Sequence, residues 1–335
     1  MKKYLLIDGM NLFFRSVHVS TRGADTEERV SYSIHVTLQS IAAATRDQKA
    51  DHVVLCLEGH SWRRKFYAPY KANRDVKRQA LTVKEQKEDA AFMDGYTNLV
   101  KFLRDHTNIT ILIHPELEAD DLIAGWIQHH PQDNHVIVSS DSDFYQLLSE
   151  NVTQYNGVTH ELHTINGIFD TKGNHVIDKK TKLPKEIPNP KFILFEKICR
   201  GDPGDNIFSA YPGVRSKGTK NKVGITEAFA DRENKGYNYN NFMLQRWADH
   251  NGLEHKVLDD YNRNVILVDL SAQPVEIRSM MDETIKNNSI VKNKPMIGAQ
   301  FLKFCGHYNL IKLSEQSTTY AALLSASYIE KEEIK

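Results

Sequence analysis

The segment YLLID (residues 4–8) is a short apolar run that ends in an aspartate, and it sets the pattern for the first half of the chain. Three similar runs follow it: HVVLCLE (52–58), ITILIH (109–114) and HVIVSS (135–140). Stretches with helical periodicity separate the four runs. Continuous β-branched runs that alternate with helices are typical of a parallel sheet covered on both faces. We therefore predict an α/β fold with a mostly parallel central sheet.

The pattern changes after the fourth apolar run. Residues 157–190 are rich in Gly and Pro, which predicts a hairpin and an extended insertion. Beyond this segment, FILFEKICR, TEAFADR, FMLQRWADH and YNRNVILVDL all favour helices. We expect an α/β core over residues 1–190 and a helical region over residues 191–335.

The composition is that of an ordinary globular protein, with 40% hydrophobic and 26% charged residues. No stretch approaches 18 apolar residues, so we expect a cytoplasmic protein without a membrane segment. The three cysteines, Cys56, Cys199 and Cys305, lie far apart and form no CxxC pair. Buried reduced thiols are therefore expected rather than a zinc site.

The 335 residues contain 43 Lys and Arg against 43 Asp and Glu, a formal net charge of zero, but the charges are unevenly distributed. The run WRRKFYAPYKANRDVKR (62–78) holds seven cations and one acid, and a second basic cluster lies in the Gly-rich segment 213–224. Basic clusters of this kind favour contacts with nucleic-acid phosphates. Because the total is balanced, the acids must be concentrated elsewhere.

Seven acids stand at or just beyond the ends of the predicted strands. The carboxyl ends of parallel strands share one edge of a sheet, so the acids should converge there. Two carboxylates ~4 Å apart repel by about 4 kcal/mol at an effective dielectric of ~20, which favours bound cations. Oxygen ligands suit Mg²⁺ or Mn²⁺. These residues are Asp8, Glu58, Glu118, Asp120, Asp121, Asp141 and Asp143.

Each acid also has an ordinary structural explanation. Acids at a helix start interact favourably with the helix dipole, which covers residues 118–121, and an Asp after a strand is often an N-cap, which covers Asp141. Further along, GDPGDN places Asp202 and Asp205 three residues apart, and turn chemistry alone explains such acids. It is less plausible that all these structural explanations hold together on one sheet edge than that the acids form a two-metal centre for phosphodiester hydrolysis.

Five motifs in a fixed order now suggest a family. LLIDGMN, WRRKFYAPYKANRD, ELEADDLIA, VSSDSDFYQLL and RGDPGDN resemble the structure-specific 5′ nucleases. This family includes flap endonucleases, the 5′ nuclease domains of bacterial DNA polymerases and phage exonucleases of the ribonuclease H type. The resemblance covers Asp8 to about Arg232. It implies a PIN-like core, a helical arch over about residues 62–87 and a helix-hairpin-helix-like motif in the C-terminal region.

The resemblance also implies functions for individual residues. Asp141 and Asp143 would be catalytic metal ligands, Lys71 and Arg74 would grip the scissile phosphate, and Tyr70 would stack on a terminal base. Two Mg²⁺ ions are implied, with Mn²⁺ as a substitute. The first would be held by Asp8, Glu58, Glu118, Asp120 and Asp141, and the second or its waters by Asp121, Asp143, Asp202 and Asp205. The implied nucleic-acid contacts are Arg63, Arg64, Tyr70, Lys71, Arg74, Lys77, Arg215, Lys217, Lys220 and Lys222.

Two positions depart from the family pattern. Glu58 stands where the family usually has Asp, so its carboxylate reaches one methylene further. The hairpin usually reads PGIGxKTA, whereas PGVRSKGTKNKVG here puts Arg215 in place of the second glycine and adds residues. Duplex binding is still expected, but binding through a monovalent ion is in doubt.

The implied substrates are branched or 5′-ended DNA and RNA–DNA hybrids in phage DNA replication. A monomer is expected, with the C-terminal helices available to a single-strand-binding or clamp protein. Two other interpretations stay open. One is a toxin-type ribonuclease of the PIN class, although such domains are smaller and lack the arch and the second acidic pair. The other is a DNA-junction binding protein that has the fold without the chemistry.

Overall fold

The chain divides into two units that are interleaved in the sequence. The computed structural model describes residues 1–19 and 25–329. Unit 1 comprises residues 1–60, 81–187 and 276–335, and unit 2 comprises residues 61–80 and 188–275. Each unit is described by itself.

A seven-stranded sheet forms the centre of unit 1. Its order is β3-β2-β1-β4-β5-β6-β7; neighbours from β3 to β5 are parallel, and β6 is antiparallel to both β5 and β7. The predicted mostly parallel sheet is confirmed, and so is a hairpin in the Gly- and Pro-rich segment. The strands are β1 Lys3–Asp8, β2 His52–Cys56, β3 Thr110–Leu112, β4 Asn134–Val138, β5 Val152–Asn156, β6 Glu161–Thr164 and β7 Gly167–Phe169.

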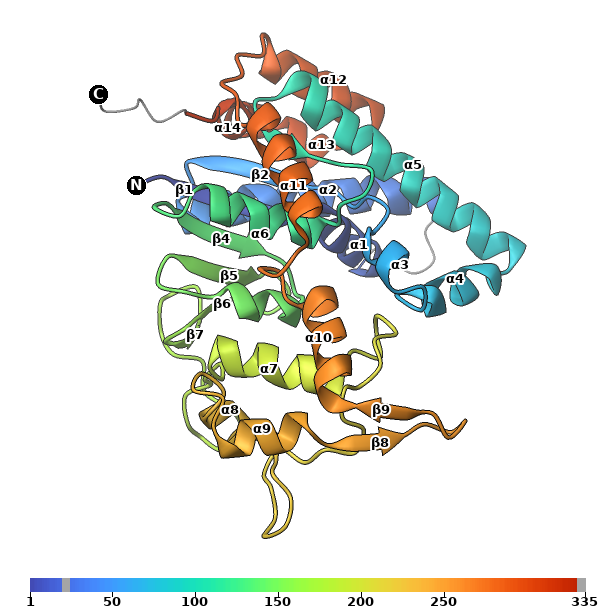
Figure 1. Cartoon of the computed structure of the whole chain (residues 1–335). Coiled ribbons are helices and arrows are strands. Elements are labelled where there is room, and N and C mark those ends of the chain that lie inside the picture. Colours follow the sequence, from blue (N-terminus) through green and yellow to red (C-terminus); the bar gives the residue numbers. More distant parts are fainter. Residues whose placement is uncertain (20–24, 330–335) are drawn as a thin grey trace. The chain divides into compact units, whose positions relative to one another are not determined.

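Helices cover both faces of this sheet (Figure 1). Alternate residues of the buried strands face opposite ways, so Leu5 and Ile7 join one apolar core while Tyr4 packs against Trp126 on the other face. The helices of the first core are α1 Gly9–Val19, α2 Thr26–Gln48, α5 Val83–His106, α12 Ile297–His307, α13 Ile311–Ser314 and α14 Ser317–Ser325. The second face carries α6 Ala119–His129, against which α11 Val275–Asn288 packs through Met281 and Ile285.

Local sequence explains where the long helices begin. Asp25 caps α2 by accepting a hydrogen bond from the Glu28 amide, 2.8 Å. Thr82 and Glu85 form a capping box at the start of α5, each side chain accepting from the other residue's amide. A 3-10 helix, η1 Ser142–Leu147, follows β4.

Unit 2 is built from short elements around two small apolar cores. One core gathers Phe195, Phe242 and Val257, and the other gathers Tyr70 and Leu267. The elements are α3 Arg63–Phe66, α4 Ala72–Gln79, α7 Pro190–Arg200, α8 Ile225–Ala230, α9 Tyr237–Met243, β8 Arg246–Ala248, β9 Glu254–Lys256 and α10 Val257–Val268. Within the predicted arch, residues 62–87, the structure has α3, α4 and the start of α5.

The observed division differs from the expected boundary at residue 190. The described residues from 276 to 329 group with the sheet because Phe301, Phe304 and Tyr320 complete its first core. The helix expected over FMLQRWADH is wrong: α9 ends at Met243, and β8 pairs with β9 in an antiparallel hairpin. Trp247 stacks on His255 across this hairpin, with ring centroids 4.2 Å apart, which stabilises the strand pairing.

The three cysteines are buried and unbridged, as expected. None of the described helices combines the length and apolar character needed to cross a bilayer.

Candidate active site and nucleic-acid interface

The strand register of unit 1 brings the first acids to one edge of the sheet. Asp8, the last residue of β1, pairs with Cys56 of β2, and the preceding Ile7 pairs with Val138 of β4. Glu58 follows β2 by two residues, and Asp141 follows β4 by three. Acids from three strands therefore leave the sheet at the same end.

Hydrogen bonds connect Asp8 to the loop after β4. The hydroxyl of buried Ser139 donates to Asp8 Oδ2 at 3.4 Å and accepts from the Asp141 amide at 3.1 Å. Asp141 Oδ1 in turn accepts from the Asp143 amide at 2.9 Å. The Gln154 side chain donates to the carbonyls of Ser139 and Asp141, so β5 fixes this loop. We did not expect Ser139 or Gln154 to take part, because their partners are distant in sequence or are backbone groups.

The remaining acids of unit 1 surround the start of α6. Glu58 Oε2 accepts from the Ala119 amide at 3.1 Å, and Asp121 Oδ2 accepts from the Glu118 amide at 3.2 Å. Glu118 and Asp121 are both buried. The helix dipole and these amides stabilise negative charge, which allows several carboxylates to gather here.

The acids of this edge also influence two neighbouring side chains. Burial, and then the carboxylates of Asp8 and Asp120, raise the pKa of the Cys56 thiol. Burial, and then Asp8 and Glu58, raise the pKa of the Tyr96 phenol. Each of these two side chains is therefore influenced by Asp8 and by an acid from another segment. Within the described residues, no three Asp, Glu, His or Cys side chains already form a group that could hold a metal ion.

In unit 2 the segment 70–74 packs on the loop RGDPGDN. Asp205 accepts hydrogen bonds from Arg74 Nη2 at 2.6 Å and from the Tyr70 hydroxyl at 3.2 Å, and Lys71 Nζ lies 3.8 Å from it. The Lys71 amide donates to the Asp205 carbonyl at 2.8 Å, and Asn73 donates to the carbonyls of residues 203 and 204. The two motifs, far apart in sequence, form one block.

Asp202 lies in the same loop with a different partner. Its carboxylate is 2.8 Å from Lys197 Nζ and accepts from the Gly204 amide. Burial alone raises the pKa of Asp202, but Lys197 and the backbone amides outweigh it and hold the pKa below the usual value. Asp202 and Asp205 belong to unit 2 and the other seven acids to unit 1, so their expected joint action on a second metal stays a prediction.

Three of the expected nucleic-acid contacts, Arg63, Tyr70 and Lys71, are buried. Arg63 is 2% exposed, donates to the Leu267 carbonyl at 2.9 Å and lies over the Trp62 ring. Tyr70 is 3% exposed and belongs to the core of unit 2, which differs from the stacking expected for it. Arg64 pairs with Asp75 at 2.6 Å. The cation-rich segment is therefore partly structural.

The other basic cluster is at the surface. The hairpin between α7 and α8 borders a hollow of about 380 Å³. Gly213 has a φ of 71°, a conformation that suits glycine, and Glu227 closes the hairpin by accepting from the amides of Gly218 and Gly224. The exposed cations of this hairpin are Arg215, Lys217, Lys220 and Lys222.

The neutral total hides opposite charges on the two units. Unit 2 contains 19 Lys and Arg against 12 Asp and Glu, a net charge of +7, which leaves 24 against 31, or −7, in unit 1. This distribution favours a phosphate-binding surface on unit 2 and a cation-binding one on unit 1.

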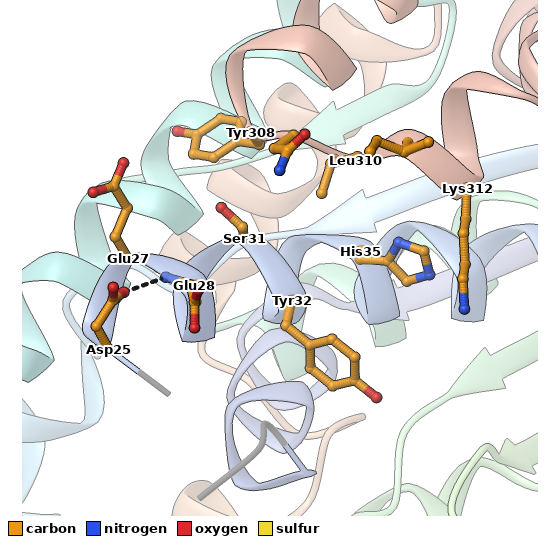
Figure 2. Close-up of a pocket in the computed structure, with 11 residues that line it drawn as sticks. Asp25, Glu27, Glu28, Ser31, Tyr32, His35, Tyr308, Leu310 and Lys312 are labelled. Carbon is orange, nitrogen blue, oxygen red and sulfur yellow. Dashed lines mark hydrogen bonds between the residues drawn. The ribbon is translucent and has the colours of Figure 1, made fainter. Parts of the chain in front are cut away.

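A hollow of about 460 Å³ lies elsewhere in unit 1, between α2 and the residues that join α12 to α13 (Figure 2). Asp25, Glu27 and Glu28 line one end, and His35 and Lys312 line the other. None of its lining residues was among the predicted site residues.

Comparisons with known proteins find relatives named as an exonuclease, a flap endonuclease and a DNA polymerase. Among curated relatives, a 5′-3′ exonuclease of Aquifex aeolicus is 25% identical over 73% of this chain and 76% of its own length. The flap endonuclease of Escherichia phage T5 is 26% identical over 69% and 71%. A DNA polymerase I of Mycobacterium bovis is 26% identical over 64% of this chain, which spans 22% of that protein.

Solved structures show the same fold. The T5 D15 protein co-crystallised with metal ions has a TM-score of 0.60 at 20% identity, with 85% of this chain and 98% of that chain covered. The T5 5′-exonuclease with bound zinc has a TM-score of 0.57 at 20% identity, covering 86% and 99%. The family described as "5'-3' exonuclease, N-terminal resolvase-like domain" matches residues 3–179, just over half of this chain. The chain therefore belongs to this 5′-3′ exonuclease family.

Proposed function

We propose that this protein is a divalent-metal-dependent 5′ nuclease that acts as a 5′→3′ exonuclease and flap endonuclease. The observation that carries the proposal is the convergence of acids from separate strands at the carboxyl edge of unit 1, beside Asp8. Relatives named 5′-3′ exonuclease and flap endonuclease support it.

The donor set fits a hard divalent cation. Carboxylate oxygens suit Mg²⁺ or Mn²⁺, and similar T5 proteins have been crystallised with metal ions. Bound metal lowers the pKa of its water and offsets charge on the phosphate. We propose two ions. Asp8, Glu58, Glu118, Asp120 and Asp141 would hold the first, and Asp121, Asp143, Asp202 and Asp205 would serve the second or its waters.

Lys71 and Arg74 would stabilise the phosphate as negative charge develops on it. Their contacts with Asp205 hold both side chains in place before substrate binds, and such preorganised charges stabilise a transition state effectively. In the proposed reaction, water attacks phosphorus and the bond from phosphorus to the 3′-oxygen breaks. The products are a 5′-phosphate and a 3′-hydroxyl.

The proposed substrates are branched or 5′-ended DNA and RNA–DNA hybrids. A T5 flap endonuclease has been crystallised with DNA and metal ions, and the exposed cations of the 213–224 hairpin suit duplex phosphates. Removal of RNA primers during phage replication is the most specific form of this proposal.

A protein partner in replication is a further part of the proposal. The hollow between α2 and the C-terminal helices would be available to a segment of a single-strand-binding or clamp protein (Figure 2). Lys312→Glu should weaken such binding without changing cleavage of naked DNA.

The test uses a labelled 5′-flap duplex and a nicked RNA–DNA hybrid, incubated with Mg²⁺ or with chelator. Asp143→Asn should abolish cleavage but leave binding largely intact, because the amide keeps the shape and loses the charge. Asp94→Asn, which changes an exposed acid on α5, is the matched control and should cleave normally.

Each outcome decides something. Metal-dependent cleavage near the junction that is lost in Asp143→Asn would support the proposal, and the relative rates would rank DNA against RNA. Tight binding without cleavage in either metal would favour a junction-binding protein, and Glu58→Asp would then be the first reversion to make. Full turnover by Asp143→Asn would refute the metal assignment.

A further inference from the structure

Tyr96 places a buried hydroxyl beside the carboxyl edge of unit 1. The side chain comes from α5 and is 8% exposed, and no described protein atom forms a hydrogen bond with its hydroxyl. The ring packs against Phe13 of α1, with centroids 5.1 Å apart. Phe13 and the surrounding core therefore hold the phenol in a fixed position.

Gly9 allows the phenol to reach this position. A Cβ added at Gly9 would lie 2.7 Å from the Tyr96 hydroxyl oxygen, closer than real Cβ contacts. Gly9 directly follows Asp8 at the end of β1. The hydroxyl therefore lies over the backbone next to a proposed metal ligand.

The electrostatic surroundings point to the same place. After burial, the two largest contributions that raise the pKa of Tyr96 come from Asp8, the last residue of β1, and Glu58, which follows β2 by two residues. A phenol carries its proton near neutral pH, so the Tyr96 hydroxyl can donate a hydrogen bond. A donor beside the carboxyl edge is suited to a water molecule held there.

The hydroxyl is not needed for packing. A phenylalanine would fill the same space, and a buried hydroxyl without a partner costs free energy. Such groups call for an explanation outside the protein's own hydrogen bonds, such as a bound ion and its waters.

We propose that the Tyr96 hydroxyl is a positioning group that donates a hydrogen bond to a water molecule bound to the divalent cation beside Asp8 and Glu58. This inference rests on the proposed function. Outer hydrogen bonds of this kind orient the ligands of a metal, and their loss commonly weakens binding about 10- to 100-fold.

The test measures metal affinity directly. Mn²⁺ binding to full-length wild type and Tyr96→Phe is followed by electron paramagnetic resonance without substrate, and melting temperatures are recorded in chelator and in Mn²⁺. We expect a Kd raised about 10-fold in Tyr96→Phe, with an unchanged or higher melting temperature in chelator. Tyr320→Phe, which alters another buried tyrosine of the same core, should bind Mn²⁺ like wild type.

Gly9→Ala provides an independent route to the same displacement. Its methyl group forces the Tyr96 hydroxyl away, so Mn²⁺ binding should weaken as in Tyr96→Phe. In the double variant the closest clashing atom, the Tyr96 hydroxyl oxygen, is gone. The Kd should then equal that of Tyr96→Phe rather than the product of both effects.

The outcomes separate this inference from the proposed function. If the wild-type protein neither binds Mn²⁺ nor cleaves DNA, both the proposed function and the role of Tyr96 are refuted. Wild type that binds and cleaves, with a Tyr96→Phe variant of equal Mn²⁺ affinity, would overturn only the assignment of Tyr96. A lower melting temperature of Tyr96→Phe in chelator, with unchanged affinity, would show that the hydroxyl serves stability instead.

Discussion

The acids of unit 1 and those of the RGDPGDN loop in unit 2 are held in opposite ways. In unit 1, Asp8 and Asp141 leave neighbouring strands and receive hydrogen bonds from amides and a serine hydroxyl. In unit 2, Asp202 and Asp205 are matched by Lys197, Lys71 and Arg74. Amides and a hydroxyl thus contact the sheet-edge acids, whereas cationic side chains contact the loop acids. Carboxylates gathered at one sheet edge favour a bound cation.

The largest expected effect comes from comparing one acid of each kind. Asp141→Asn should lower turnover more than about 1,000-fold, because it removes a proposed metal ligand while its amide oxygen still caps η1. Asp202→Asn should cost about 10-fold, since Lys197 already balances that charge. Single-turnover cleavage of a 5′ flap measures both. Equal losses of turnover in the two variants would contradict the distinction between the sheet-edge acids and the loop acids.

A fall in pH should destabilise unit 1 more than unit 2. Burial is the main reason that the pKa of His52 is lowered to about 4, below its ordinary 6.5. The neutral ring is favoured in the folded state, so its stabilisation is complete above pH 6.5 and is lost as pH falls toward 4. The expected loss is about 3 kcal/mol.

His52→Gln provides the control for this pH dependence. Glutamine retains hydrogen-bonding groups near the Ala326 carbonyl and the Thr110 hydroxyl but does not titrate. Denaturant unfolding of wild type at pH 7 and pH 4.5 should show unit 1 weakening more than unit 2. The variant should show a smaller pH dependence, and an identical one would remove His52 as the cause.

Lys71 tests whether the cations of unit 2 act in chemistry or only in binding. Lys71→Ala should lower kcat about 100-fold, because its Nζ is positioned by Asp205 to stabilise developing charge. Lys77→Ala, an exposed position on α4, should raise KM and leave kcat nearly unchanged. An unchanged kcat in Lys71→Ala would exclude Lys71 from the transition state.

The sequence predicted unit 1 better than unit 2 for a physical reason. A buried parallel strand appears in the sequence as a continuous apolar run, and the acids at the strand ends lie on one edge of the sheet. The local sequence pattern therefore predicts both the sheet and the position of its acids. The burial of Arg63 and Tyr70 depends on Leu267 and Asp205, which are distant in sequence. The local sequence pattern does not identify such distant partners.

The same reasoning explains two other differences. FMLQRWADH has a composition suited to a helix, yet the stacking of Trp247 on His255 favours two paired strands. This contact forms because the turn at Gly252 brings the two residues together. Tyr96 is a buried residue of α5, and its neighbours in the sequence do not indicate a role in the site. Only the structure shows that its hydroxyl lies near Gly9 and is influenced by Asp8, and this position suggests its proposed role.

The smallest expected effect concerns the exposed hairpin of unit 2. Lys222→Ala should weaken duplex binding a few-fold for every sequence and reduce the slope of log K against log salt by about 0.9, because one phosphate contact is lost. Lys312→Ala, an exposed lysine of unit 1, should change neither quantity. If the two variants behaved alike, the opposite charges of the units would not direct DNA to unit 2. A loss specific to Lys222 would show that they do, because the two variants carry the same change in total charge.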